Sequence, residues 1–124
     1  MRILVLEEQP IVALSLNDIL LDLGAEVVGP ALSIDHALSL AQTADMEAAV
    51  LNLWLGDHRS YPVGEVLAQR NIPFVLTSGF ARHDEPDCFR HAPRVLKPFS
   101  GGELCAALMV ALHGRNDRRE LSEG

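Results

Sequence analysis

The chain has little cysteine and no long apolar run, and each shortage excludes a class of protein. Its two cysteines, Cys88 and Cys105, are too few and too far apart for a disulfide framework or a zinc site. We expect both to be free structural thiols in a reducing compartment. No apolar stretch approaches the roughly 20 residues that a membrane span needs, so we expect a cytoplasmic protein without a membrane partner.

Basic residues are also scarce. The sequence carries 17 acidic and 10 basic residues, which gives a formal net charge of -7. Such a charge repels nucleic-acid backbones and anionic membrane surfaces, so we expect no nucleic-acid partner. The apolar share of 48% and the length of 124 residues are ordinary for one globular domain. We therefore expect any output to come from a single folded unit.

Short, wholly apolar runs recur along the chain, and they are typical of strands that are buried on both faces of a parallel sheet. Helical patterns separate them. The alternation predicts a doubly wound α/β fold with five parallel strands and helices on both faces. The predicted strands are residues 3–6, 27–28, 48–53, 72–76 and 95–96.

The helices have recognisable start and stop signals. Pro10 opens the first helix and Gly24 ends it, while Ser33 caps the second. A short third helix covers residues 63–67, and the last amphipathic helix is expected to end at Gly114. The prolines within 81–93 leave room there for at most a turn or two of helix. We therefore expect a domain over residues 1–113 and a polar tail over 114–124.

Polar residues follow four of the five predicted strands. Because the carboxyl ends of parallel strands meet at one edge, these side chains should share a pocket beside the topological switch point. Two carboxylates, an amide, a hydroxyl and an ammonium from four strand ends form a specific combination. The residues are Glu7, Glu8, Asn52, Ser78 and Lys97.

This pattern resembles that of response regulator receiver domains, the CheY-like modules of two-component systems, over residues 1 to about 113. The resemblance implies a flavodoxin-like strand order, 2-1-3-4-5, and a role for each strand-end residue. Glu7 and Glu8 match the acidic pair that holds magnesium, and Asn52 matches the aspartate that accepts phosphate. Ser78 matches the switch hydroxyl, and Lys97 matches the lysine that receivers carry before proline.

Three positions depart from the receiver pattern. Asn52 offers an amide in place of the carboxylate nucleophile, and an amide is a far poorer nucleophile. Glu8 is one methylene longer than the aspartate usual there, which disturbs the near-octahedral geometry that magnesium demands. Arg94 replaces the Tyr or Phe that swings inward when receivers switch. We therefore expect no cofactor, with Mg²⁺ binding weak at best and resting on Glu7 and Glu8.

The sequence leaves several interpretations open. Lys97 is expected to pair with Glu7 or Glu8, or to bond the Asn52 carbonyl. Trp54 is predicted to be a core or rim residue in preference to an exposed anchor for a partner, and its exposure decides between the two. Phe80, which also flanks a strand-end loop, is predicted in the same way.

The leading hypothesis is a degenerate, single-domain receiver that is not an enzyme and signals by binding proteins without being phosphorylated. Its partner would be a histidine kinase, a phosphotransferase or a regulator, bound through the last two helices and the fifth strand, and a homodimer is possible. The alternative is a phosphorelay intermediate that accepts phosphate at another residue. Asp57 is a poor candidate for that acceptor, because it has no matching lysine or hydroxyl. A nucleotide or flavin protein is disfavoured, because two glutamates replace the glycine-rich turn after the first strand.

Overall fold

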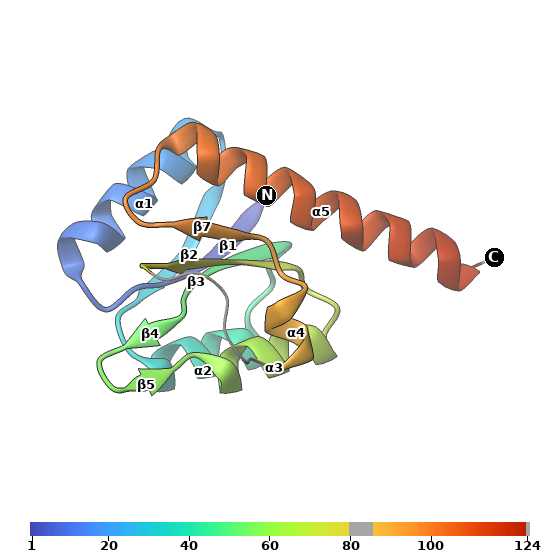
Figure 1. The fold of residues 1–124 in the computed structure, drawn as a ribbon, viewed down its shortest axis with the longest axis horizontal. Helices are drawn as coiled ribbons and strands as arrows, with labels where there is room; N and C mark the ends of the chain where they lie inside the picture. The colour runs from blue at the N-terminus through green and yellow to red at the C-terminus, as the bar shows by residue number, and fades with distance from the viewer. Residues whose placement is uncertain (80–85, 124) are drawn as a thin grey trace.

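A parallel sheet of five strands separates two layers of helices in the computed structural model, which describes residues 1–79 and 86–123, with side chains up to residue 114 (Figure 1). The sheet order is β2-β1-β3-β6-β7, and every neighbouring pair is parallel. The predicted fold class and flavodoxin-like order are therefore confirmed. The strands are β1 (Arg2–Leu6), β2 (Glu26–Ala31), β3 (Ala48–Asn52), β6 (Phe74–Ser78) and β7 (Arg94–Leu96).

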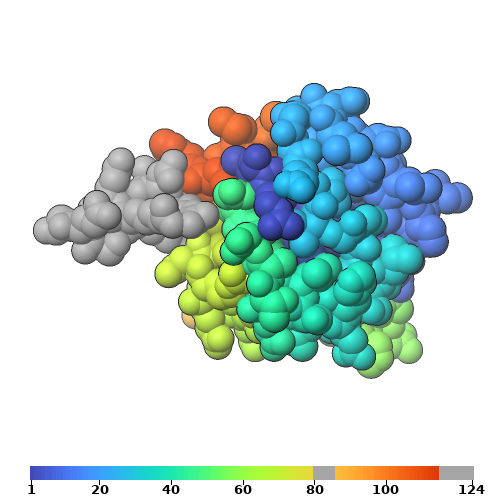
Figure 2. Space-filling model, turned by 180° about the vertical axis from the view of Figure 1, so that it is seen from behind, coloured from blue at the N-terminus to red at the C-terminus, as the bar shows by residue number. Residues whose placement is uncertain are grey.

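Helices α1 (Pro10–Asp22) and α5 (Gly101–Glu123) cover one face of the sheet. Helices α2 (Ile34–Thr43), α3 (Tyr61–Gln69) and α4 (Asp87–Arg90) cover the other. Figure 2 shows the same division from behind, with the blue of α1 and the orange of α5 on one side and the cyan of α2 on the opposite side. Alternate side chains of each central strand enter the two hydrophobic cores in turn, which is why these strands are apolar throughout.

The predicted helix signals act as expected in the first two helices. Pro10 occupies the first turn of α1, and Gly24 follows its end with a φ of 83°. Hydrogen bonds from Gly24 N to Leu21 O and from Ala25 N to Leu20 O close this end in a Schellman motif. The side chain of Ser33 accepts a hydrogen bond from His36 N, which caps α2.

Strand β6 begins two residues later than predicted and reaches Ser78. Ile72 donates its N–H to Leu67 O, so it still belongs to the end of α3, and Pro73 has no N–H to give to a ladder. The predicted loop after β3 contains a small hairpin that the sequence pattern did not indicate. Its strands are β4 (Trp54–Leu55) and β5 (His58–Arg59).

The predicted end of the last helix at Gly114 is wrong, because α5 continues to Glu123. A glycine in a helix interior costs only about 1 kcal/mol, and the residues that follow include several good helix formers. Figure 1 shows this half of α5 extending beyond the sheet. Within the described residues, no helix is both long and apolar enough to span a bilayer.

Helix α4 is a single turn, as the prolines around it predict, and one aromatic side chain holds it in place. Phe89 is fully buried, with ring centroids 4.7 Å from Tyr61 and 5.4 Å from Phe74. The ring rests against Gly64 of α3, where an added Cβ would lie 2.6 Å from Phe89 Cε2. The absence of a side chain at Gly64 therefore makes room for this anchor. The earlier part of the predicted irregular stretch, with Phe80, lies outside the described residues.

Candidate functional site

Three polar residues meet at the carboxyl edge of the sheet. Glu7 follows β1 directly, Asn52 ends β3, and Lys97 follows β7. Glu7 is fully buried and Asn52 is 5% exposed, whereas the Lys97 side chain is 30% exposed. Because β1 and β3 are neighbours and β7 lies two strands away, only a long side chain such as Lys97 can span the remaining distance.

These residues form one closed hydrogen-bonded network. Lys97 Nζ lies 2.9 Å from Glu7 Oε1 and donates a second hydrogen bond to Asn52 Oδ1 at 3.2 Å. Asn52 Nδ2 donates to Glu7 Oε2 at 3.4 Å, and Gln9 N donates to the same oxygen at 3.0 Å. Lys97 thus makes two of the contacts considered from the sequence, the ion pair with Glu7 and the bond to the Asn52 carbonyl.

The network explains how a glutamate is tolerated at zero exposure. A buried carboxylate is costly unless it is paired and hydrogen-bonded. Glu7 has an ammonium on one oxygen, and a backbone amide and a side-chain amide on the other. Its charge is therefore met by this chain's own groups.

Glu8 turns away from Glu7, although the two are adjacent in sequence. It is exposed, and its Oε1 accepts a hydrogen bond from Gly56 N at 3.2 Å. Gly56 has a φ of 60° at the tip of the β4–β5 hairpin, a conformation that favours glycine. Glu8 therefore ties the loop after β1 to the hairpin and stands outside the Glu7–Asn52–Lys97 network.

Ser78 and Arg94 take the positions that the sequence predicts, at the end of β6 and the start of β7. Ser78 is 2% exposed, and its carbonyl accepts a hydrogen bond from Lys97 N at 2.8 Å. Arg94 pairs with Leu76 in the ladder and is partly buried. Both residues therefore adjoin the strand that leads to Lys97.

The sequence argument missed three contributors to this edge. The backbone amides of Gln9 and Gly56 each bind one of the acidic side chains, and no residue pattern reveals a backbone donor. Thr77 was not singled out from the sequence. It is fully buried beside Asn52 in the β3–β6 ladder, and no partner for its hydroxyl is found in the described part of the chain.

A doubly wound α/β domain with a polar pocket at its carboxyl edge defines the class of this protein, and comparisons with known proteins define it further. No family model matches the chain. The solution structure of SdrG from Sphingomonas melonis Fr1 is 34% identical, covers 90% of this chain and 96% of that one, and superposes with a TM-score of 0.79. A response regulator receiver protein from Sinorhizobium medicae WSM419 is 23% identical, with coverage of 93% and 96% and a TM-score of 0.79.

A curated relative, the transcriptional regulatory protein PdtaR of Mycobacterium tuberculosis, is 24% identical over 115 residues, or 90% of this chain. The chain spans only 56% of the length of that relative. The chain belongs to the response regulator receiver (CheY-like) domains. Such domains serve two-component signal transduction as signalling modules and are not enzymes.

Proposed function

We propose that this receiver domain acts in the cytoplasm by binding a protein partner and that it is not phosphorylated. The observation that carries the proposal is the closed network of Glu7, Asn52 and Lys97. Asn52 stands where the resemblance puts the phosphate acceptor. Its side-chain amide already bridges Glu7 and Lys97, which in an active receiver would help to bind the metal and the phosphoryl group.

The chemistry of Asn52 supports the absence of phosphotransfer. A receiver aspartate attacks phosphorus with an anionic oxygen, while a cation and a lysine offset the charge that builds up. The amide of Asn52 has no such anion, and its Oδ1 accepts a hydrogen bond from Lys97. Lys97 Nζ also lies 2.9 Å from Glu7 Oε1, so the ammonium is engaged before any phosphate arrives.

The residues at the pocket do not fit a magnesium ion in this arrangement. Magnesium takes oxygen ligands at roughly 2.0 to 2.1 Å in near-octahedral geometry. Both oxygens of Glu7 bind donors of this chain, and Glu8 is directed to Gly56 N. Among the described residues, no three His, Cys, Asp or Glu side chains are close enough to hold a metal ion. We therefore propose that the domain needs no metal to keep its fold.

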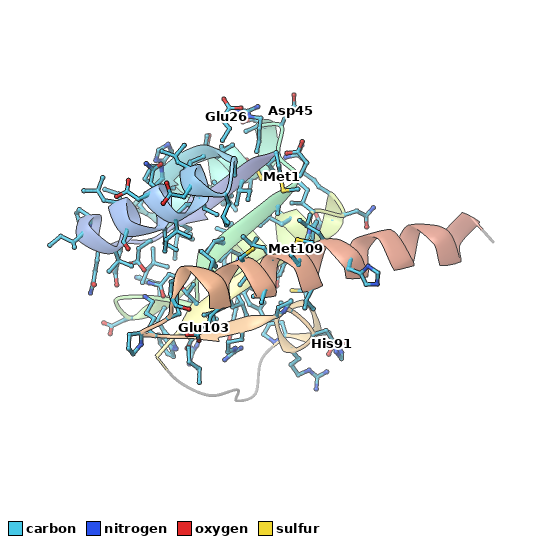
Figure 3. All side chains as sticks on the ribbon, turned by 90° about the horizontal axis from the view of Figure 1, so that it is seen from above. Met1, Glu26, Asp45, His91, Glu103 and Met109 are labelled. Carbon is cyan, nitrogen blue, oxygen red and sulfur yellow. The ribbon has the colours of Figure 1, made fainter. Side chains whose placement is uncertain are left out.

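The partner would be a histidine kinase, a phosphotransferase or a regulator, bound through the face of α4, β7 and α5. Exposed aliphatic side chains on two of these elements support this choice. Leu96 of β7 is 50% exposed, and Met109 and Val110 of α5 are each 63% exposed. Figure 3 looks onto the layer of α1 and α5, with Met109 labelled on α5. Exposed apolar groups can serve as interaction sites, and α1 carries further ones, with Ile11 83% and Leu14 62% exposed. A second copy of this chain is another possible occupant.

The experiment is phosphorylation of the purified protein with acetyl phosphate and Mg²⁺, followed by intact-mass measurement. We expect no gain of a phosphoryl group, while an active receiver treated in parallel gains one. A phosphoryl group that hydroxylamine removes would reveal an acyl phosphate and overturn the proposal. Asp57, exposed at the hairpin tip, would be the first acceptor to examine, through Asp57→Asn.

A further inference from the structure

The β4–β5 hairpin holds one arginine in an unusual setting. The Arg59 guanidinium carbon lies 3.5 Å from the centroid of the Trp54 ring and 5.8 Å from that of Tyr61. Trp54 and Arg59 are directly opposite in the hairpin register, so the stack follows from strand pairing. Arg59 itself is exposed, and Trp54 is half-buried against the core below α2 and α3.

Ring contacts are the only interactions of the Arg59 side chain with the described residues. Other basic side chains are paired with carboxylates: Arg2 with Glu26, Arg90 with Asp87 and Lys97 with Glu7. Arg70 donates to the carbonyls of Ala41 and Ala44. In a chain with 17 acidic residues, an exposed guanidinium without a carboxylate is notable, because it keeps its donors available.

Hydrogen bonds hold the hairpin at its base and at its tip. Ser60 N donates to Leu53 O at 3.0 Å, and Gly56 N donates to Glu8 Oε1 at 3.2 Å. Leu55 is 7% exposed and belongs to the core. An arginine that is stacked on a fixed hairpin loses less side-chain entropy when it binds a ligand, because its planar guanidinium is already oriented.

We propose that the hairpin is a docking element and that Arg59 binds a carboxylate of a protein partner. Arginine, tryptophan and tyrosine are the residues that dominate binding energy at protein interfaces. Here Arg59 stacks on Trp54, and its guanidinium carbon lies 5.8 Å from the Tyr61 ring. A guanidinium donates two parallel N–H hydrogen bonds to the two oxygens of a carboxylate. The inference rests on the proposed function in one respect, that the domain acts by binding a protein, and it names the chemistry of that partner.

Two observations favour a carboxylate on a protein over a phosphate. The net charge of -7 and the nearby exposed Glu8 and Asp57 repel a dianion more strongly than a monoanion. Beside the hairpin lies a hollow of about 420 Å³, whose lining combines the apolar Leu32, Ile34 and Leu55 with the polar Glu8, Ser33, Asp35 and His58. A protein partner whose carboxylate binds Arg59 could place an adjacent side chain in this hollow, whereas a free anion has no such side chain.

The test uses Trp54, the single tryptophan of the chain, as its own reporter. The protein is titrated at low salt with a capped Gly-Leu-Glu-Gly peptide, which carries one negative charge, with a capped Gly-Leu-Gln-Gly peptide and with inorganic phosphate, and Trp54 fluorescence is recorded. We expect a saturable change with the glutamate peptide. Arg59→Gln should weaken the apparent affinity about tenfold, which corresponds to about 1.4 kcal/mol. Arg59→Lys keeps the charge and loses the planar fork of N–H donors. Its apparent affinity should therefore lie between those of the parent and Arg59→Gln.

Arg90→Gln is the matched control, because it removes the same charge from another exposed arginine, one that pairs with Asp87. We expect it to leave the affinity within about twofold, since a distant surface charge is screened. An equal response to the glutamine peptide, or unchanged binding by Arg59→Gln, would overturn the proposal. Phosphate binding as tight as that of the glutamate peptide would overturn the carboxylate assignment. Phosphorylation is measured in the separate acetyl phosphate experiment. Detection of a phosphoryl group there would overturn the proposed function without changing the outcome of the peptide titration.

Discussion

Asn52→Asp is the substitution that tests the pocket most directly. It replaces the Asn52 Nδ2 donor, 3.4 Å from Glu7 Oε2, with an oxygen that faces a second carboxylate. At an effective dielectric constant near 20, two unit charges at that distance repel each other by about 5 kcal/mol. Lys97, 3.2 Å from the other oxygen, attracts the new charge by a similar amount. The Coulomb terms thus nearly cancel.

The uncompensated loss in Asn52→Asp is the hydrogen bond from the amide to the charged Glu7. A hydrogen bond to a charged group contributes about 1.5 to 3 kcal/mol, so we expect the free energy of unfolding to fall by about 2 kcal/mol at pH 8. For a domain of this size the melting temperature should fall by about 8 °C. Because the Coulomb terms of Glu7 and Lys97 nearly cancel, burial at this 5% exposed position raises the pKa of the introduced carboxyl above that of an unfolded aspartate, about 3.9. Protonation therefore removes the desolvation cost at low pH, and the destabilisation grows as the pH rises from the unfolded pKa to the folded pKa.

The assay is thermal melting of the parent and Asn52→Asp at about pH 5 and pH 8, with and without Mg²⁺. A cation bound at ten times its Kd stabilises by about 1.4 kcal/mol, so the variant should regain several degrees while the parent changes little. Asn52→Ala is the control, because it removes the hydrogen bonds without adding charge. Equal magnesium shifts in parent and variant would refute the reasoning. Even with metal, we expect the variant to respond weakly to phosphate, since Glu8 and Arg94 remain.

Three further predictions use single contacts. Lys97→Met should lower the free energy of unfolding by about 3 kcal/mol in chemical denaturation, because it leaves the charge of Glu7 buried without its cation. Gly64→Ala should cost about 1 to 3 kcal/mol by the same measurement, since its Cβ meets Phe89, and Phe89→Leu in the same chain should recover part of the loss. Burial first, and the charge of Glu65 second, raise the pKa of the Cys88 thiol. Alkylation of Cys88 followed by mass spectrometry should therefore be slower at pH 7.5 than that of an unstructured cysteine peptide and should accelerate only at higher pH.

The parallel sheet and the meeting of Glu7, Asn52 and Lys97 could be predicted from the pattern of strands and helices, whereas the strand order was implied by the resemblance to receiver domains. Buried parallel strands are apolar along their whole length, so the first polar residue marks the carboxyl end. Those ends necessarily share one edge of the sheet. The sequence pattern therefore predicts which residues lie close together. It does not predict the direction in which each side chain points.

The features that the sequence did not predict depend on a few atoms. Glu8 leaves the pocket because one backbone amide, that of Gly56, lies within its reach. The β4–β5 hairpin has two residues in each strand, too few for any periodicity to register. The length of α5 was underestimated because a glycine that often ends helices is also tolerated inside them, at Gly114. Local sequence signals determine side-chain directions and helix ends only where tertiary contacts do not override them.

The chemistry of an amide accounts for the form of the pocket better than the simple loss of a carboxylate. A carboxylate only accepts hydrogen bonds, whereas an asparagine of the same shape offers one acceptor and one donor side by side. Asn52 uses both, accepting from Lys97 and donating to Glu7, and so closes a ring that an aspartate could not close without a cation. Under the proposed function, this ring takes the place of the metal and phosphate that organise an active receiver. The domain would then present one fixed surface to its partner, and its regulation would have to come from the amount or location of the protein.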